Sequence, residues 1–387
     1  MADSRTVCPC IDVDKFIRTN NNMDAVRYIM AFSVIVAHFN ELLGFAIPWP
    51  ISSGTGVGGF FALSGFLIYR SWERRPRLGP YLRNRALRIL PPYFLVVLLC
   101  AFGLVAISSL SAREYFLSPQ WLKYLLANLS FLNFLEPSLP GVFEGGQYAS
   151  PAVNGALWTM KVEWCLYLSV PVVAYVVSKV RIRRRHTLVF SMIILLSVAW
   201  SVFFLWRYAA TEREIYAILG RQFFGQLSFF YIGALAALNL ERLLRYKWWV
   251  LGVLLAGVAL MQTGIYVRAA LWPAVDGLLV IWVSMVGRWG RHFARHDNVS
   301  YDMYLFHFPI LQLCVYFGLP ELGVVVSFVV SLLATVVLSL LSWNLVGKRA
   351  MSFRSRIAAA RRKSKSAAAG ASGATTLKSR LRTLDFF

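Results

Sequence analysis

The chain has 387 residues, of which 58% are hydrophobic and only 15% are charged. This composition is too apolar for an ordinary soluble domain of this length, and it indicates an integral membrane protein. The formal net charge of +22 would suggest a nucleic-acid-binding protein if the basic residues formed one patch, but they are spread over many short segments. We therefore expect membrane lipids, and no nucleic acid, among the partners.

Ten apolar runs are close to the roughly 20 residues that a helix needs to cross a bilayer. They predict an all-α polytopic membrane protein, a bundle of about ten transmembrane helices. The ten predicted spans are 23–44, 51–69, 89–109, 156–178, 188–206, 217–238, 248–266, 269–287, 299–317 and 322–346.

Lys and Arg alternate between the two sides of this predicted bundle. With the N-terminus in the cytoplasm, 32 of the 40 basic residues fall in inside segments, 5 in outside segments and 3 within spans. Such alternation follows the positive-inside rule, so we expect both termini to be cytoplasmic. The basic excess then reflects topology first, and contact with anionic headgroups or a phosphate-bearing ligand second.

The two ends of the chain differ from the bundle. Residues 1–22 form a polar cytoplasmic segment without a cleavable signal pattern, so the first span is expected to act as signal and anchor. Residues 347–387 are basic and rich in Ser, Ala and Gly, which predicts a disordered cytoplasmic tail near the membrane surface. Residues 23–346 form the transmembrane domain. Its longest outside segment, 110–155, is either a surface connector or a functional loop.

The first span carries two ionisable residues that a lipid-facing helix would not need. Arg27 and His38 are eleven residues apart, so they share a helix face and lie about 16 Å apart along the axis. Arg27 would lie near the cytoplasmic end and His38 about half to two thirds of the way across. One reading is that Arg27 snorkels to the interface and His38 binds a carbonyl of a neighbouring helix. The other is that one long ligand contacts both residues.

The second and third spans add small residues and arginines. The segment Gly54–Ile68 concentrates glycines at the entrance of the second span, which allows close approach of either a helix or a ligand. Arg85 and Arg88 share a helix face at the cytoplasmic boundary before the third span. They either anchor the protein to lipid headgroups or bind the phosphates of a cytoplasmic donor.

The fourth and ninth spans contain further ionisable residues. Glu163 lies a few residues inside the fourth span, near its outer end, and Asp302 and His307 lie in the ninth. Carboxylic acids and histidines at membrane depth allow proton transfer. No G-x-S-x-G, P-loop or metal-ligand spacing is present, which argues against a serine hydrolase, a nucleotide-driven pump or a metalloenzyme. We therefore expect no metal.

Five of these stretches resemble, in order, the motifs of acyltransferase family 3, the bacterial integral-membrane O-acyltransferases of cell-surface glycans. They are distributed over a range of about residues 23–316, nearly the whole predicted bundle. The stretches are MDAVRYIMAFSVIVAHF, GGFFALSGFLIY, NRALRILPPYF, LWTMKVEWCLYL and SYDMYLFHFPIL.

The resemblance implies a membrane-bound O-acyltransferase of the bacterial cytoplasmic (inner) membrane. Such an enzyme moves an acyl group, usually acetyl, from cytoplasmic acyl-coenzyme A to a hydroxyl of a glycan or lipid-linked sugar. The residue roles that it implies are catalytic for His38 and Glu163, donor binding for Arg27, Arg85, Arg88 and Ser64, and a supporting motif of Ser300, Tyr301, Tyr304 and His307.

Several alternatives stay open at this point. His38 would act as a general base or through an acyl-histidine, and Glu163 would orient the imidazole or bind the sugar. A proton-coupled transporter or acyl-group translocator would use the same buried groups, whereas a scaffold would not need His38. One departure from the family pattern is Gly347, which stands where the family often has Glu.

Overall fold

The structure is a computed structural model that describes residues 22–182, 184–293 and 297–353. This part of the chain is helical and contains no strand, which confirms the all-α prediction. The predictions for residues 1–21 and 354–387 fall outside the described residues. The principal helices are α2 (Met23–Leu43), α3 (Ser53–Arg74), α4 (Leu78–Gly103), α5 (Ala112–Leu117), α6 (Pro119–Leu129), α7 (Trp158–Lys179), α8 (Arg185–Thr211), α9 (Glu214–Gly220), α10 (Phe223–Leu238), α11 (Leu240–Arg245), α12 (Lys247–Leu260), α13 (Ile265–Met285), α14 (Ser300–Tyr316) and α15 (Val324–Ser342).

Each of the ten predicted spans contains a helix, and in the part described, six helical segments are long and apolar enough to cross a membrane. The protein is thus a multi-pass membrane protein. The sixth predicted span is not one helix, because the chain breaks between α9 and α10 at Arg221 and Gln222. The count of ten and the cytoplasmic termini remain predictions. The six segments are Met23–Leu43, Leu78–Ile107, Gly155–Lys179, Arg185–Thr211, Ile265–Met285 and Val324–Phe353.

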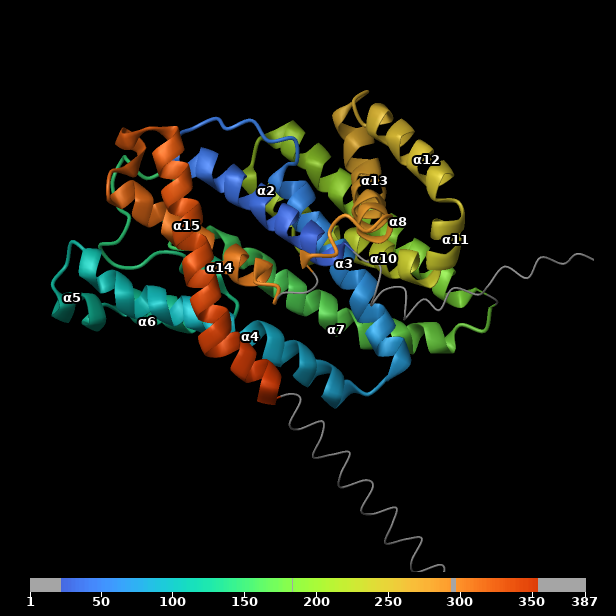
Figure 1. The fold of residues 1–387 in the computed structure, drawn as a ribbon, viewed down its shortest axis with the longest axis horizontal. Coiled ribbons are helices and arrows are strands. Elements are labelled where there is room, and N and C mark those ends of the chain that lie inside the picture. Colours follow the sequence, from blue (N-terminus) through green and yellow to red (C-terminus); the bar gives the residue numbers. More distant parts are fainter. Residues whose placement is uncertain (1–21, 183, 294–296, 354–387) are drawn as a thin grey trace, which may run out of the picture.

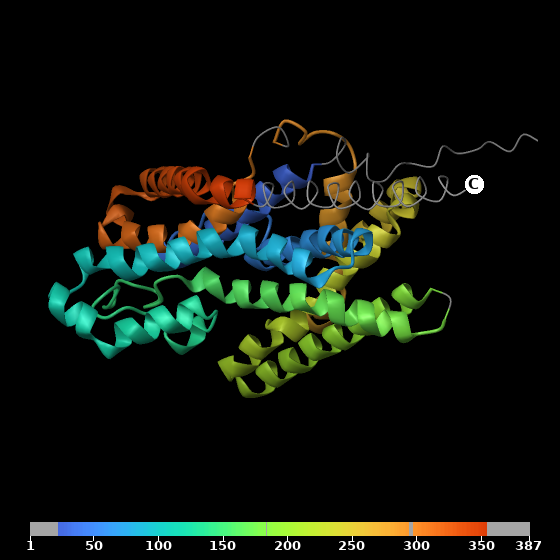
Figure 2. The same ribbon diagram turned by 90° about the horizontal axis from the view of Figure 1, so that it is seen from below.

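The helices stack in layers. Figure 2 shows α15 on one side and the antiparallel helices α8 and α10 on the other, with α4 and α7 running between them. In Figure 1, α2 and α14 lie side by side near the middle of the molecule, and α5 and α6 lie at one end. The central position of α2 and α14 matters because α2 carries His38 and α14 carries His307.

Two glycines allow α3 and α10 to pack with their backbones almost in contact. A Cβ at Gly65 would lie 1.8 Å from the carbonyl oxygen of Phe230, and a Cβ at Gly233 would lie 1.9 Å from that of Ala62. No side chain fits at either position without moving a helix. Tight helix packing is therefore a demonstrated role of Gly65.

The segment before α7 enters the bundle instead of staying on its outer surface. Val153, Ala156 and Leu157 are almost completely buried. Asn154 donates from Nδ2 to the carbonyl oxygen of Leu305 at 2.8 Å. That carbonyl lacks its usual helical partner, because Pro309, four residues on, has no N–H.

A second proline in the bundle is supported in the same way. Pro171 in α7 leaves the carbonyl oxygen of Tyr167 without its helical donor. The hydroxyl of Tyr81 on α4 donates to this oxygen at 2.8 Å. In both cases a side chain from another element satisfies a carbonyl that a helix-interior proline leaves free.

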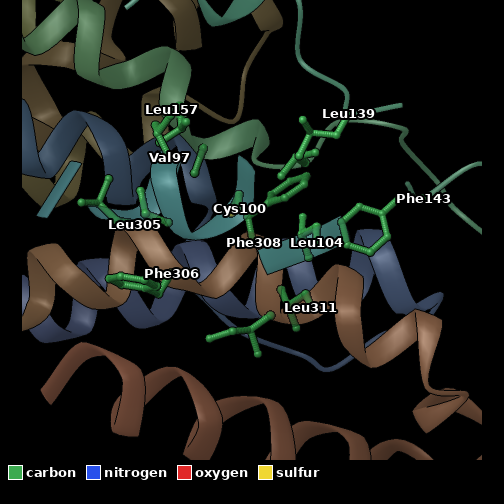
Figure 3. Packing of buried hydrophobic residues seen from close by; sticks show 14 of the residues in the cluster. Val97, Cys100, Leu104, Leu139, Phe143, Leu157, Leu305, Phe306, Phe308 and Leu311 are labelled. Carbon is green, nitrogen blue, oxygen red and sulfur yellow. The ribbon is translucent and has the colours of Figure 1, made fainter. Parts of the chain in front are cut away.

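Of the two alternatives for 110–155, the surface connector is therefore wrong in part. The segment contains α5, with a capping box between Ser111 and Glu114, and α6. Several of its later residues, among them Leu139, Phe143 and Val153, are buried. Leu139 and Phe143 pack with Leu311 of α14 in one hydrophobic cluster (Figure 3). The loop is a structural part of the bundle.

Gly347 lies in a π-helical turn, Trp343–Gly347, that extends α15. A Cβ at this position would lie 2.5 Å from the ring of Trp343. The indole therefore occupies the space that a glutamate side chain would need. The glycine at position 347, where the family often has Glu, is thus matched by the position of the Trp343 ring.

Candidate functional site

A cavity of about 80 Å³ lies among α2, α3, α4, α7 and α14. Its walls combine apolar side chains with arginine, carboxylate and hydroxyl groups. The lining residues are Arg27, Val57, Phe60, Phe61, Ser64, Leu67, Ile68, Arg85, Arg88, Ile89, Thr159, Met160, Glu163, Tyr167, Ser300, Tyr301 and Tyr304.

The structure brings every predicted site residue except the two histidines onto this one cavity. Helices that are far apart in the sequence contribute them, so no single motif could have shown the arrangement. The two exceptions, His38 and His307, contact each other instead.

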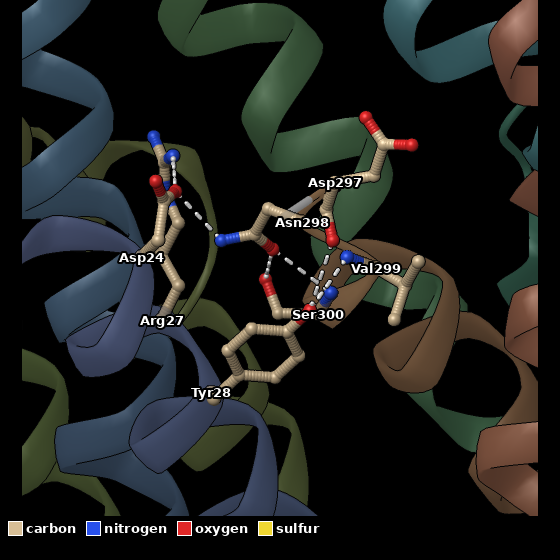
Figure 4. Close-up of polar contacts among 7 residues, drawn as sticks. All are labelled: Asp24, Arg27, Tyr28, Asp297, Asn298, Val299 and Ser300. Atoms are coloured by element: carbon tan, nitrogen blue, oxygen red, sulfur yellow. Dashed lines mark hydrogen bonds and ion pairs between the residues drawn. The ribbon is translucent and has the colours of Figure 1, made fainter. Parts of the chain in front are cut away.

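Arg27 is held in place by a chain of polar contacts between the N-terminal ends of α2 and α14 (Figure 4). Its Nη1 atom lies 3.3 Å from Oδ1 of Asp24. The same oxygen accepts a 2.7 Å hydrogen bond from Nδ2 of Asn298, whose Oδ1 accepts from the Ser300 hydroxyl at 2.6 Å. Tyr28 adds a second connection by accepting from the backbone N–H of Val299 at 3.0 Å. These contacts fix the guanidinium of Arg27 at the cavity.

Arg85 and Arg88 reach the cavity from α4. The Nε of Arg85 is buried and has no hydrogen-bond partner within the described residues. Arg88 is exposed and also lines the cavity, so it lies on the open side. A buried guanidinium N–H without a partner is costly in a membrane protein, which fits a site that receives an anionic ligand.

Glu163 lies within Coulombic reach of all three arginines and accepts a hydrogen bond from Tyr167, one turn further along α7. The prediction that Glu163 lies near the outer end of its span, away from the arginines at the cytoplasmic boundary, is therefore wrong. Glu163 and the arginines meet because α4 begins at Leu78, well before residue 89, and because the residues before α7 have already entered the bundle. Glu163 is a partial counter-charge in an otherwise cationic cavity.

The supporting motif forms the far wall of the cavity. Tyr301 donates from its hydroxyl to the carbonyl oxygen of Ile89 at 3.1 Å, which ties α14 to α4. The hydroxyl of Tyr304 lies 3.0 Å from that of Thr159 on α7. The rings of Tyr304 and His307 have their centroids 5.8 Å apart, so the cavity ends beside the histidine pair.

His38 and His307 form a hydrogen-bonded pair between α2 and α14. Nδ1 of His38 lies 2.8 Å from Nε2 of His307. His307 is completely buried, whereas His38 is partly exposed and packs edge to face against Phe308. The idea that Glu163 orients the imidazole of His38 finds no contact in the structure, where this position is taken by His307.

A cleft of about 400 Å³ lies beyond the pair, at the other ends of α2 and α14. Along α2 the order is Arg27 in the cavity, His38 in the pair and Glu41 in the cleft. Along α14 the order is Tyr304 in the cavity, His307 in the pair and Val315 in the cleft. The other lining residues of the cleft are Leu42, Leu43, Gly44, Gly146, Gln147, Ala149, Gly318, Pro320 and Glu321.

Sequence reasoning missed Tyr167, Thr159 and Asn298. Tyr167 stands four residues after Glu163, so the shared helix face was a usable signal. Asn298 precedes the ninth-span motif, and nothing in its local sequence indicates a contact with the start of α2. Such contacts between distant segments appear only in the folded chain.

The arrangement combines an arginine-rich cavity suited to an anionic ligand with a histidine pair suited to proton transfer. A family model described as "Acyltransferase domain", of the type-3 acyltransferases, matches residues 20–344. The chain is similar to "Nodulation protein 10" of Rhizobium leguminosarum bv. viciae, with 23% identity over 88% of this chain and 96% of that protein. It is also similar to "O-acetyl transferase" of Shigella phage Sf6, with 23% identity over 85% of this chain and 96% of that protein. No solved structure matches the chain.

Proposed function

Because the chain belongs to acyltransferase family 3 and is a membrane acyltransferase, we propose that it transfers an acetyl group from cytoplasmic acetyl-coenzyme A to a glycan hydroxyl. The acceptor is a cell-surface or exported glycan, or its lipid-linked precursor. The membrane is the bacterial cytoplasmic membrane. The observation that carries the proposal is the cavity in which Arg27, Arg85 and Arg88 converge next to the histidine pair.

Donor binding follows from the charges of the cavity. Coenzyme A carries several phosphate charges, and guanidinium groups bind phosphates through forked, charge-assisted hydrogen bonds. Exposed Arg88 meets the phosphates first, and the partly buried Arg85 and Arg27 draw the donor inward. The apolar wall from α3, which includes Phe60 and Phe61, accommodates the acyl-pantetheine arm.

The acceptor approaches from the cleft at the other ends of α2 and α14. Glu41, Glu321 and Gln147 line this cleft, and their oxygens accept hydrogen bonds from sugar hydroxyls. The histidine pair then lies between donor and acceptor, which is where a group that removes a hydroxyl proton has to be.

His38 performs the chemistry in this scheme. As a neutral imidazole it takes the proton from the acceptor hydroxyl while the oxygen attacks the thioester carbonyl, and the thiolate of coenzyme A leaves. An acyl-histidine on His38 is the alternative, in which the acyl group passes first to the imidazole and then to the sugar. Both routes require His38, so one substitution tests them together.

The decisive experiment measures acyl transfer by the purified protein in lipid nanodiscs, with radiolabelled acetyl-coenzyme A and a glycan acceptor. We expect His38→Ala to abolish transfer and His292→Ala, which changes an exposed histidine, to leave it unchanged. Undiminished transfer by His38→Ala would refute the catalytic role of His38. The alternative outcome is that the folded wild type transfers no acyl group from any short-chain acyl-coenzyme A, while vesicles that contain the protein take up a solute. That result would favour a transporter.

A further inference from the structure

The partner of His38 is a buried imidazole rather than a carboxylate, and this has a consequence for the position of one proton. Nδ1 of His38 and Nε2 of His307 are 2.8 Å apart, so one of these nitrogens carries a hydrogen and the other accepts it. Which nitrogen is the donor decides whether Nε2 of His38 has a free lone pair. The second ring nitrogen of His307 settles the question.

Nδ1 of His307 faces the backbone carbonyl oxygen of Met303 at 3.3 Å. A carbonyl oxygen only accepts hydrogen bonds, so an unprotonated Nδ1 would place two lone pairs against each other. Neutral His307 therefore carries its hydrogen on Nδ1 and has an unprotonated Nε2. The acceptor in the histidine pair is His307, and the donor is Nδ1–H of His38.

From this geometry we infer that His307 is a positioning residue that holds His38 in the tautomer with Nδ1 protonated and Nε2 free to act as a base. The inference rests on the proposed function and names the atom that performs its proton transfer. Nε2 of His38 makes no hydrogen bond to any described residue, and His38 is partly exposed, so this atom is open to an incoming hydroxyl.

The proton-transfer step balances within this arrangement. The acceptor hydroxyl gives its proton to Nε2 of His38 as its oxygen forms the new C–O bond, and the C–S bond of the thioester breaks with the electron pair going to sulfur. His38 is then an imidazolium that still donates from Nδ1 to Nε2 of His307. It releases the Nε2 proton to the thiolate of coenzyme A, which regenerates the neutral pair.

The nearby carboxylates do not take the part of His307. Glu163 hydrogen-bonds to Tyr167, and Asp302 accepts from the Ser342 hydroxyl at 2.5 Å. Among the described residues, His307 is the only group that hydrogen-bonds the imidazole of His38. The base is therefore oriented by a group that adds no charge to the resting site.

The experiment compares His307→Gln with His307→Leu in the full-length protein. The Gln amide oxygen can take the place of Nε2 and accept from His38, whereas Leu has a similar volume and no acceptor. We expect His307→Leu to lower kcat by roughly 10²–10⁴-fold with little change in the KM for acetyl-coenzyme A, since the arginines are untouched. His307→Gln should restore kcat to within about tenfold of wild type.

Phe306→Leu serves as the packing control, because Phe306 is a buried residue of the same helix outside the pair. We expect this variant to lower the unfolding temperature without changing kcat. Equal losses of kcat in His307→Leu and His307→Gln would overturn the acceptor role. So would full activity in His307→Leu.

A second measurement does not depend on catalysis. Long-range ¹⁵N–¹H spectra of histidine-labelled protein report which ring nitrogen carries hydrogen. We expect His38 to be protonated on Nδ1 in wild type and to change tautomer in His307→Leu. A wild-type His38 protonated on Nε2 would overturn the inference. A protein that shows the expected tautomer but no acyl transfer would instead refute the proposed function.

Discussion

At the scale of single residues, the arginines of the cavity can be separated by their positions on one helix. Arg85 lines the cavity, whereas Arg83 on the same helix does not. A hydrogen bond to a charged group contributes roughly 1.5–3 kcal/mol, so we expect Arg85→Gln to raise the KM for acetyl-coenzyme A by about 10- to 100-fold.

Arg83→Gln is the matched control, because it removes the same charge two residues earlier. Steady-state kinetics over a range of donor concentrations provide the measurement. An equal rise of KM in both variants would mean that the arginines act only through the overall charge of this face.

At Glu163, in contrast to Arg85, a substitution is expected to strengthen donor binding. Its carboxylate lies within Coulombic reach of the three arginines and repels an anionic donor. We expect Glu163→Gln to bind coenzyme A more tightly by on the order of 1 kcal/mol, about fivefold, as measured by isothermal titration calorimetry. Glu321→Gln, in the distant cleft, should leave the affinity unchanged. Weaker binding by Glu163→Gln would show that this residue supports the donor directly.

At the scale of helices, Tyr81, Tyr167 and Pro171 form a unit that a double-mutant cycle can resolve. Tyr81→Phe removes the donor to the Tyr167 carbonyl, which Pro171 leaves without a helical partner. We expect Tyr81→Phe to destabilise the protein by about 1–3 kcal/mol, because a buried carbonyl is left unsatisfied. In a Pro171→Ala background the helix supplies its own N–H, and the loss should largely disappear.

Thermal unfolding in detergent, followed by the fluorescence of a thiol-reactive dye, would measure the four proteins of this cycle. Equal losses in both backgrounds would mean that the hydroxyl of Tyr81 stabilises the protein in some other way.

Local sequence patterns were sufficient to predict the helices but not how deep each segment lies in the bundle. The apolar runs predicted a helix in every expected span, because a bilayer requires a minimum apolar length. They failed at Gln222, where a break interrupts an apolar run, and between the spans at Leu139, Val142, Phe143 and Val153, which are buried without being part of a span. The first is set by local backbone geometry. The second is set by long-range hydrogen bonds such as that of Asn154 to Leu305.

The site was predictable as a set of residues but not as a geometry. The motifs contained every group that lines the polar side of the cavity, yet the pairing of His38 with His307 and the approach of Glu163 to Arg85 depend on which helices are neighbours. One sequence does not show that α2 lies against α14 or that α7 lies against α4. The residue types carry the chemistry, and the packing of the bundle assigns their partners.

At the scale of the whole molecule, the cavity is small compared with what it is proposed to bind. About 80 Å³ is well below the roughly 300–1,000 Å³ of small-molecule sites, so donor binding must separate side chains of α3, α4 and α7. A ligand that binds only the folded bundle stabilises it, by about 2.7 kcal/mol at 100 times its Kd.

We therefore expect coenzyme A to raise the unfolding temperature of the wild type and to have a much smaller effect on Arg85→Gln. Differential scanning fluorimetry over a series of coenzyme A concentrations provides the measurement, with adenosine as the control ligand without phosphate. An equal shift with adenosine would show that the phosphates do not contribute to recognition.

The burial of His307 between the cavity and the cleft also bears on the electrical integrity of the membrane. An enzyme whose donor and acceptor arrive from opposite compartments needs sites on both sides, and an open passage between them would conduct ions down the electrochemical gradient. Here His307 is completely buried, and Phe308 packs tightly against Gly155, where even a Cβ would lie 2.7 Å from the ring. Under the proposed function, this packing separates the cavity from the cleft, and we expect acyl transfer to proceed while the proton-motive force is conserved.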